Sequence, residues 1–212
     1  MLAPSPSVSP WLRALLVAAA AALLFARLGA LEASAPDEPR YLQVSEEVRA
    51  FAHGAQGLVL LHLNGEPYTQ KPPLYYWLAA AAGVRDGRVT ELAGRVPSAA
   101  AGVLLVWATL ALGSRLLGAR AGFLGAALLL TTYEFARLAR RVQLDPLLAL
   151  LETLALAAFW RLDRGIGRRA TNAAAFHLAL GLAVLTKGPV GFLVPALIVV
   201  VYLAWEGRLR TI

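Results

Sequence analysis

Cysteine is absent from the 212-residue sequence, which excludes disulfide bonds and thiolate metal sites. Charged residues make up only 16% of it, and its three histidines, His53, His62 and His177, show no metal-ligand spacing. Acidic residues are outnumbered by Lys and Arg, 13 against 20, for a net charge of +7. Because the arginines lie mainly in short loops between apolar segments, anionic lipid accounts for them, and the sequence predicts no nucleic-acid partner.

Apolar residues are in excess. They make up 58% of the sequence, and the mean hydropathy is +0.61, whereas soluble domains are about 45–50% apolar. Several apolar runs approach the roughly 20 residues that a helix needs to cross a bilayer. Barrel-like alternation is missing, so the composition predicts an all-α, polytopic transmembrane bundle in contact with the lipid bilayer.

The apolar runs predict about six spans and a long first external loop. The expected spans are 11–31, 97–117, 118–135, 146–162, 173–185 and 189–205. The loop, residues 32–95, should hold short interfacial helices at 41–52 and 74–84, and spans two to six should fill residues 96–205. Residues 1–10 are expected to be a disordered tail and 206–212 a basic cytoplasmic tail. A cleavable signal peptide ending near Ala33-Ser34-Ala35 is the rival interpretation of the first span, but the later spans argue against it.

Alternation of six spans places loops one, three and five on one face. That face mixes carboxylates with cations, whereas the opposite face is a basic collar of arginines that includes Arg161, Arg164, Arg168 and Arg169. Positive charge in short loops favours the cytoplasm. The mixed-charge face is therefore expected to be external.

Two motifs of the first loop carry chemistry. Asp37-Glu38 is suited to act as a general base with a neighbouring carboxylate that raises its pKa or shares a cation; a solvated acidic loop is the alternative. Lys71 precedes two prolines that fix the backbone and aim its ammonium, a point charge suited to phosphate. The alternative for Lys71 and its aromatic neighbours is an interfacial anchor.

Two further motifs lie on the same face. Asp145-Pro146 is typical of a helix start, with Asp at the N-cap, and Arg141 lies just before it, so this loop offers a cation to an anion and a carboxylate to a sugar hydroxyl. Lys187-Gly188 breaks the chain between two spans and leaves Lys187 either as a capping lysine or as a phosphate ligand.

Together these motifs resemble the N-terminal half of a C-type membrane glycosyltransferase, of the family that includes protein O-mannosyltransferases and the lipid A aminoarabinose transferase. The resemblance rests on five segments in the family's order: Asp37 to Tyr41, Glu66 to Trp77, Arg95 to Ser98, Arg141 to Asp145, and Gly181 to Pro189. Family members are roughly twice this length.

The resemblance implies a transferase that moves a sugar from a polyprenyl-phosphate carrier to an acceptor lipid, glycan or protein, at the external or periplasmic face of the bacterial plasma membrane. It implies catalytic roles for Asp37 and Glu38, and donor-phosphate or substrate binding by Arg40, Tyr41, Tyr68, Lys71, Arg141, Asp145 and Lys187. A divalent metal stays open, although Gln70 replaces the acid that the aminoarabinose branch carries before the lysine. The rival functions are a lipid-phosphate transporter or flippase-like protein without transfer chemistry, and an inactive fragment.

Overall fold

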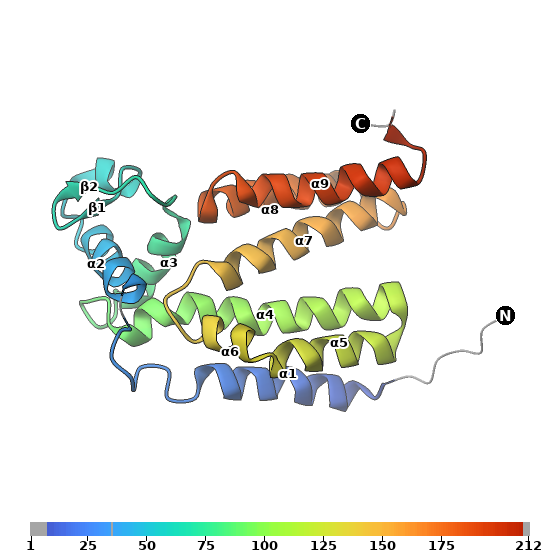
Figure 1. Ribbon diagram of the computed structural model, residues 1–212, viewed down its shortest axis with the longest axis horizontal. Coiled ribbons are helices and arrows are strands. Elements are labelled where there is room, and N and C mark those ends of the chain that lie inside the picture. Colours follow the sequence, from blue (N-terminus) through green and yellow to red (C-terminus); the bar gives the residue numbers. More distant parts are fainter. Residues whose placement is uncertain (1–7, 35, 210–212) are drawn as a thin grey trace.

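Long helices lying side by side form the body of the molecule, and short elements gather at one end of it (Figure 1). The computed structural model describes residues 8–34 and 36–209. The long helices are α1 (Pro10–Phe25), α4 (Glu91–Leu117), α5 (Ala119–Thr131), α7 (Asp145–Asp163), α8 (Arg169–Lys187) and α9 (Val190–Trp205). The short ones are α2 (Asp37–Arg49), η1 (Gly54–Leu58), β1 (His62–Leu63), β2 (Glu66–Pro67), α3 (Leu74–Gly83) and α6 (Tyr133–Ala139).

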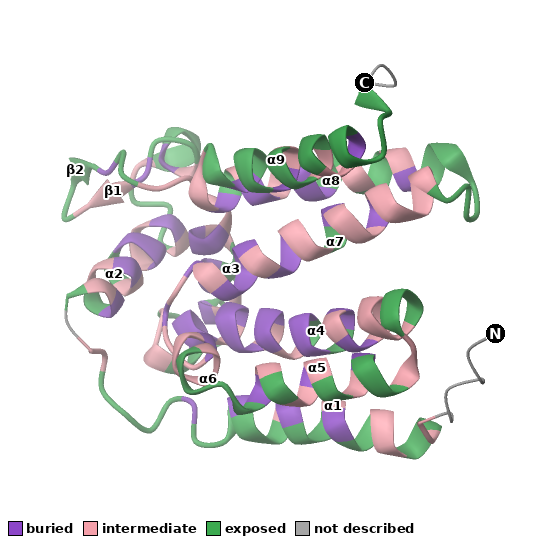
Figure 2. Ribbon diagram, turned by 45° about the vertical axis from the view of Figure 1, so that its right-hand side comes forward, coloured by how far each residue is buried: buried purple, intermediate pink, exposed green. Residues whose placement is uncertain are grey.

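Helix α4 is the centre of the bundle and contacts α1, α3, α5 and α7, while α8 packs against α7 and α9. The Thr90 side chain caps the N-terminus of α4 by accepting a hydrogen bond from the Ala93 amide. Helix α4 therefore begins six residues before the expected start of that span, residue 97. The largest buried cluster lies where α2, α3, α4, α7 and α8 meet. Figure 2 shows this buried region on α2, α3 and α4.

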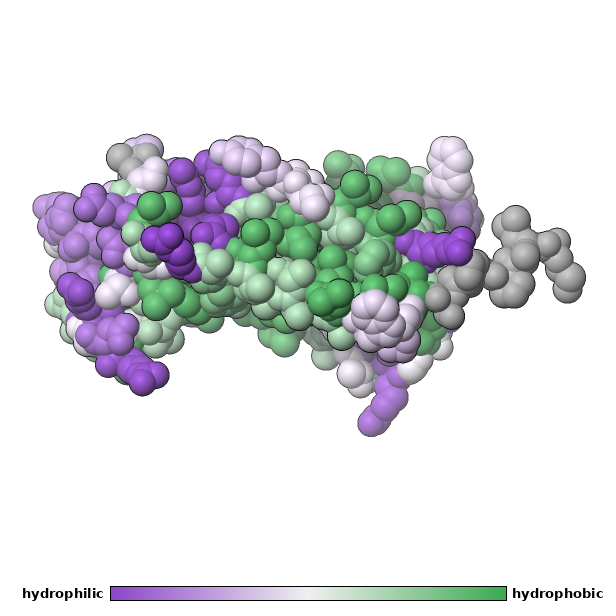
Figure 3. All heavy atoms as spheres, turned by 90° about the horizontal axis from the view of Figure 1, so that it is seen from below, coloured by the Kyte–Doolittle hydropathy of each residue, from purple (hydrophilic) through white to green (hydrophobic). Residues whose placement is uncertain are grey.

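Apolar residues cover the outside of the bundle as well as its core. Seen from the side of α1, a broad hydrophobic belt lies between more hydrophilic ends (Figure 3). Large exposed apolar surfaces of this kind mark membrane contact, so the composition and the surface agree on a membrane protein. By length and composition, one helix in the described ranges, α4, is suited to cross a bilayer; α1, α5 and α9 are shorter apolar helices.

One expected span ends earlier in the structure and another is divided. The first was expected to reach residue 31, but α1 ends at Phe25 because Ala26 leaves the helical conformation, with a ψ of 115°, and Arg27 follows with a left-handed φ of 51°. The expected span 118–135 is divided at Thr132, whose extended backbone separates α5 from α6, and the Thr132 hydroxyl donates to the Leu128 carbonyl. The expected tails, 1–10 and 206–212, lie partly outside the described residues; Pro10 already belongs to α1.

The first loop contains a small hairpin that was not expected from the sequence. Strands β1 and β2 pair antiparallel, with His62 opposite Pro67 and Leu63 opposite Glu66. The turn is Asn64-Gly65, with φ of 56° and 83°, and Asn-Gly is a strong sequence signal for such a turn. The Glu47 carboxylate of α2 accepts hydrogen bonds from both turn amides, at 2.6 and 3.3 Å.

Helices α8 and α9 approach closely at Gly191. A Cβ added there would lie 2.3 Å from the Ala183 carbonyl carbon, a backbone atom that cannot move aside. We expect Gly191→Ala to lower the free energy of unfolding by about 1–3 kcal/mol through overpacking. Denaturant unfolding in detergent checks this.

The matched control for Gly191 is Gly181→Ala, in α8, where an added Cβ would meet no atom within 4 Å. Replacing a mid-helix glycine by alanine in open space is expected to raise the free energy of unfolding by about 0.5–1 kcal/mol. Equal effects of the two substitutions would contradict the close approach.

Candidate functional site

Asp37 and Arg40 form an ion pair in the first turn of α2. The helix begins at Asp37, so the two side chains, three residues apart, lie on the same side of it. The Asp37 side chain keeps 39% of its surface exposed. The Arg40 Nε is buried and has no hydrogen-bond partner in the part of the chain that the structure describes. This pair is therefore reachable by a ligand and has a donor to offer it.

Three tyrosines form a wall beside this pair. The Arg40 guanidinium carbon lies 5.5 Å from the centre of the Tyr41 ring, and Tyr76 packs edge-on against both Tyr41 and Tyr68, at 5.8 and 6.1 Å between ring centres. Burial raises the pKa of Tyr41 to about 12, so its hydroxyl stays protonated at neutral pH. The hydroxyls of Tyr68 and Tyr76 are buried without a hydrogen-bond partner among the described residues. The wall thus adds polar atoms that a sugar or phosphate can satisfy.

Lys71 lies on the neighbouring loop, before α3. Its ammonium has no ion-pair or hydrogen-bond partner among residues 8–34 and 36–209. The following Pro72 lies against the turn between α8 and α9, because a Cβ added to Gly188 would come 4.0 Å from the Pro72 Cγ. Segments about 115 residues apart in the chain therefore bring Lys71 and Lys187 to neighbouring positions at one end of the bundle.

Lys187 and Asp145 meet at this end. Lys187, the last residue of α8, donates to the Asp145 Oδ1 at 2.5 Å, and both side chains are partly exposed. Asp145 was expected to be an N-cap, but α7 begins at Asp145 itself, and its carboxylate makes no capping bond. Glu152, two turns along α7, is close enough to Lys187 for their charges to interact, and its Oε1 is buried without a partner among the described residues.

Glu38 differs from the general-base partner that the sequence predicted. Its side chain is 2% exposed and forms a buried ion pair with Arg95 of α4, with Arg95 Nε at 2.9 Å from Oε1. The backbone amides of Ser34 and Val142 also donate to the carboxylate, at 2.9 and 2.8 Å. Burial raises the pKa of Glu38, but the bonds from Arg95 and the two amides outweigh it and leave the pKa below its ordinary value.

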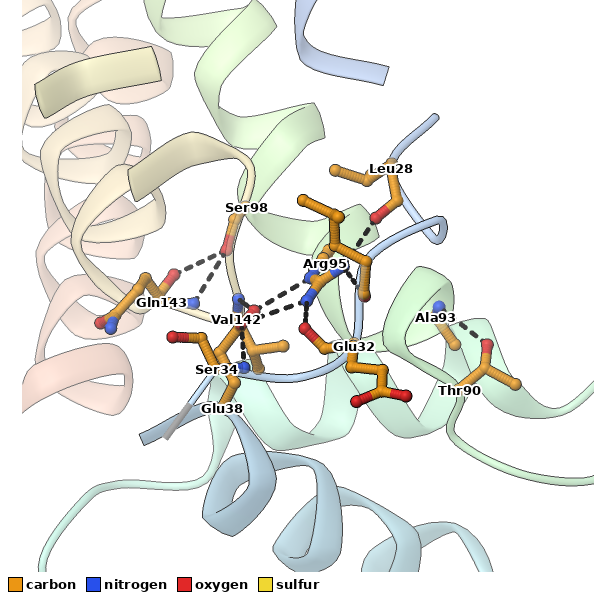
Figure 4. Close-up of polar contacts among 12 residues, drawn as sticks. Leu28, Glu32, Ser34, Glu38, Thr90, Ala93, Arg95, Ser98, Val142 and Gln143 are labelled. Atoms are coloured by element: carbon orange, nitrogen blue, oxygen red, sulfur yellow. Dashed lines mark hydrogen bonds and ion pairs between the residues drawn. The ribbon is translucent and has the colours of Figure 1, made fainter. Parts of the chain in front are cut away.

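The same arginine ties the chain between α1 and α2 to α4. Its guanidinium donates to the carbonyls of Leu28, Leu31 and Glu32 at 2.8–3.1 Å (Figure 4). With every oxygen of Glu38 and every terminal nitrogen of Arg95 engaged, the pair has no free atom for a substrate. We refer to Glu38, Arg95 and these backbone groups as the Arg95 hub. Because Glu38 follows Asp37 in the chain, the Arg95 hub fixes the start of α2 next to Asp37.

A second buried network supports α3. The Tyr75 hydroxyl donates to the Gly94 carbonyl at 2.9 Å and lies 2.6 Å from the Ser98 hydroxyl. Ser98 is in turn bonded to the backbone of Gln143, which leads into α7. Neither Tyr75 nor Ser98 was predicted to support the site, although the motif containing Arg95 and Ser98 was part of the resemblance.

Arg141 lies apart from the lysines. It lines a pocket of about 300 Å³ whose wall also includes Arg27, Glu38, Arg137 and Arg140. Arg140 donates to the carbonyls of Leu23 and Ala26 at the end of α1, and Arg137 is paired with Glu134. The predicted site residues thus fall into three neighbouring groups: the Asp37–Arg40 pair with its tyrosines, the Lys71–Lys187–Asp145 group, and Arg141.

As for a metal, the described residues contain no group of three or more His, Asp or Glu side chains arranged to hold an ion. Asp37 is engaged with Arg40, and Asp145 with Lys187. Among these residues, the charged groups that the site offers to a ligand are lysine and arginine cations and aspartate carboxylates.

The chain is similar in sequence to known proteins. Residues 10–211 match the family model of dolichyl-phosphate-mannose-protein mannosyltransferase. The chain is 33% identical over 177 residues to an undecaprenyl phosphate-alpha-4-amino-4-deoxy-L-arabinose arabinosyl transferase of Pseudomonas savastanoi pv. phaseolicola, covering 82% of this chain and 32% of that protein. The corresponding Pseudomonas aeruginosa transferase is 34% identical over 179 residues, with the same two coverages.

The fold is also similar to solved structures. The crystal structure of ArnT from Cupriavidus metallidurans bound to undecaprenyl phosphate superposes with a TM-score of 0.81 at 28% identity, covering 93% of this chain and 36% of that one. Its apo state gives a TM-score of 0.80. The chain spans about a third of the length of these curated relatives.

Proposed function

The chain belongs to the dolichyl-phosphate-mannose-protein mannosyltransferase family, and on that premise we propose that it forms the donor-binding and catalytic end of a membrane glycosyltransferase. The enzyme would move a sugar from a polyprenyl-phosphate carrier to an acceptor. The observation that carries the proposal is the contact between the segments of Pro72 and Gly188, which places Lys71 and Lys187 on neighbouring turns at the bundle end where α2 begins.

Each group has a role in displacement at the anomeric carbon of the sugar. Negative charge develops on the carrier phosphate as it leaves, and cations already positioned there stabilise the transition state. Lys71, which has no partner among the described residues, and Lys187 are the cations we assign to this phosphate. The Asp37 carboxylate takes the proton of the acceptor hydroxyl.

Arg40 and the tyrosine wall complete the proposed pocket. Arg40 holds the Asp37 carboxylate on one side and keeps its buried Nε available for a ligand oxygen. The hydroxyls of Tyr68 and Tyr76, buried without partners in the described chain, suit the hydroxyls of a sugar ring. Asp145, paired with Lys187, extends the pocket toward α7, and Arg141 offers a further cation from the neighbouring pocket beside α6. Glu38 acts as a positioning residue in this proposal, since its oxygens are all engaged in the Arg95 hub.

The proposed topology is six spans, with the catalytic end external. Helices α1, α4, α5 with α6, α7, α8 and α9 are the spans, and α2, α3 and the hairpin form the loop at the membrane surface. The arginine collar at the other end supports a cytoplasmic placement of that end. The protein would then lie in the bacterial plasma membrane with its active face outside.

The donor site is tested by binding of undecaprenyl phosphate to the chain in lipid nanodiscs. Lys71→Ala and Lys187→Ala are each expected to weaken binding by about tenfold, because a charge-assisted bond to phosphate is lost from a partly exposed position. The matched control is Arg120→Ala, which removes an exposed cation from the opposite end of the bundle. Binding that both lysine variants leave unchanged would contradict the phosphate assignment.

A further inference from the structure

A groove runs between α1 and α4 at the end of the bundle opposite the proposed catalytic site. Its volume is about 770 Å³, within the range of about 300–1,000 Å³ that small-molecule sites occupy. Its walls are apolar over most of their length. They include Ala14, Val17, Ala18 and Ala21 of α1, and Trp107, Leu110 and Ala111 of α4.

The groove exists because α1 presents small side chains at this point. Ala14, Ala18 and Ala21 are spaced four and three residues apart, so they lie on one face of the helix. Trp107, facing them from α4, is half exposed. A long apolar chain, more than a compact ligand, fits walls of this shape and composition.

Charge is confined to one end of the groove and has one sign. Arg13 and Arg115 line that end, and none of the described lining residues is acidic. The Arg13 Nε is buried and has no hydrogen-bond partner among the described residues. A buried donor without an acceptor is costly, so its presence indicates an acceptor that comes from outside the described chain.

We propose that this groove binds an anionic phospholipid of the bilayer leaflet at the Arg13 end. The phosphate accepts hydrogen bonds from Arg13 and Arg115, and one acyl chain lies along the alanines of α1 against Trp107. The start of α1, which carries Arg13, and the end of α4, which carries Arg115, lie at the same end of the bundle (Figure 1). The lipid would therefore join the two helices at the basic end, away from the carrier phosphate.

The test is native mass spectrometry of the full chain in detergent, titrated with dioleoyl phosphatidylglycerol and, separately, with dioleoyl phosphatidylcholine. One phosphatidylglycerol is expected to bind more tightly than any phosphatidylcholine. Arg13→Gln and Arg115→Gln should each weaken this binding about fivefold, the usual contribution of one basic residue near anionic lipid.

Substitutions at two alanines distinguish lipid binding in the groove from lipid binding elsewhere on the surface. Ala18→Leu places a larger side chain in the groove and is expected to weaken phosphatidylglycerol binding with both arginines intact. The matched control is Ala19→Leu. Ala19 is also exposed on α1 but does not line the groove, so this variant should bind the lipid as the unchanged chain does. Arg120→Gln is the control for charge, since Arg120 is an exposed cation outside the groove lining.

Three results would overturn the proposal. The first is equal affinity for the two lipids. The second is a loss of affinity shared by Arg120→Gln, which would indicate general attraction to the basic end. The third is an Ala18→Leu variant that keeps its lipid but loses association between copies of the chain, which would assign the groove to a second copy.

Discussion

Replacing Arg95 with methionine is expected to lower the free energy of unfolding by about 3–5 kcal/mol, the usual cost of removing one partner from a buried ion pair. The side chain is 4% exposed and bonds both oxygens of Glu38 and three backbone carbonyls. Methionine leaves the Glu38 carboxylate buried without its cation and removes the donor from the three carbonyls. Denaturant unfolding of the chain in detergent, followed by circular dichroism, measures the loss.

A second substitution tests whether the cost comes from the uncompensated charge. Glu38→Leu in the Arg95→Met background removes that charge, so the double variant is expected to be more stable than Arg95→Met alone. The control is Arg137→Gln, which breaks the exposed pair with Glu134 and should leave stability unchanged within error. An Arg95→Met variant as stable as that control would show that the Arg95 hub is not a structural element.

Replacing Asp37 with asparagine is expected to reduce the turnover of a polyprenyl-phosphate sugar by about 10²–10⁴-fold, the range attributed to general acid–base catalysis. Asparagine keeps the shape of the side chain and removes the base. Since the proposed phosphate cations are untouched, binding of the carrier should change little. Turnover is measured as the loss of radiolabelled sugar from the polyprenyl-phosphate carrier. This readout works with any acceptor.

The control for Asp37 is Asp86→Asn, the same substitution at an exposed position of the first loop. The Asp86→Asn variant should turn over the carrier at the same rate as the unchanged chain. A protein that only binds or moves lipid phosphate would tolerate the loss of Asp37, so full turnover by Asp37→Asn would reject the transferase proposal. A protein in which neither the original chain nor any variant releases the phosphate would be the inactive form that the sequence also allows.

Much of the architecture follows from local pattern. The apolar runs locate α4 and α7 to α9 to within a few residues, except that α4 starts earlier, and Asp145 and Lys187 meet at one end because an even number of bundle crossings separates their loops. The family resemblance is confirmed by the match over residues 10–211. Six spans and the assignment of faces stay predictions.

The main error, the role assigned to Glu38, comes from long-range contact. Asp37 and Glu38 are adjacent and chemically similar, yet the first is partly exposed and the second is buried. What separates them is an arginine 57 residues away and an amide 104 residues away, neither of which a local pattern reveals. The division at Thr132 and the early end of α1 have a different, local cause, which is the backbone conformation of one or two residues. The hairpin at Asn64-Gly65 was not predicted, although Asn-Gly is a local signal that could have indicated it.

The partners of Glu38 also set an order of events during synthesis. Its carboxylate accepts from Ser34, Arg95 and Val142, so these bonds cannot all form until the ribosome has passed residue 142. Until then the first loop carries Asp37 without the contacts that fix the start of α2. It follows that the proposed catalytic end matures only after α4, α5 and α6 have been made. Nascent chains halted before Val142 should leave the first loop open to proteases, and chains halted well beyond it should protect the loop.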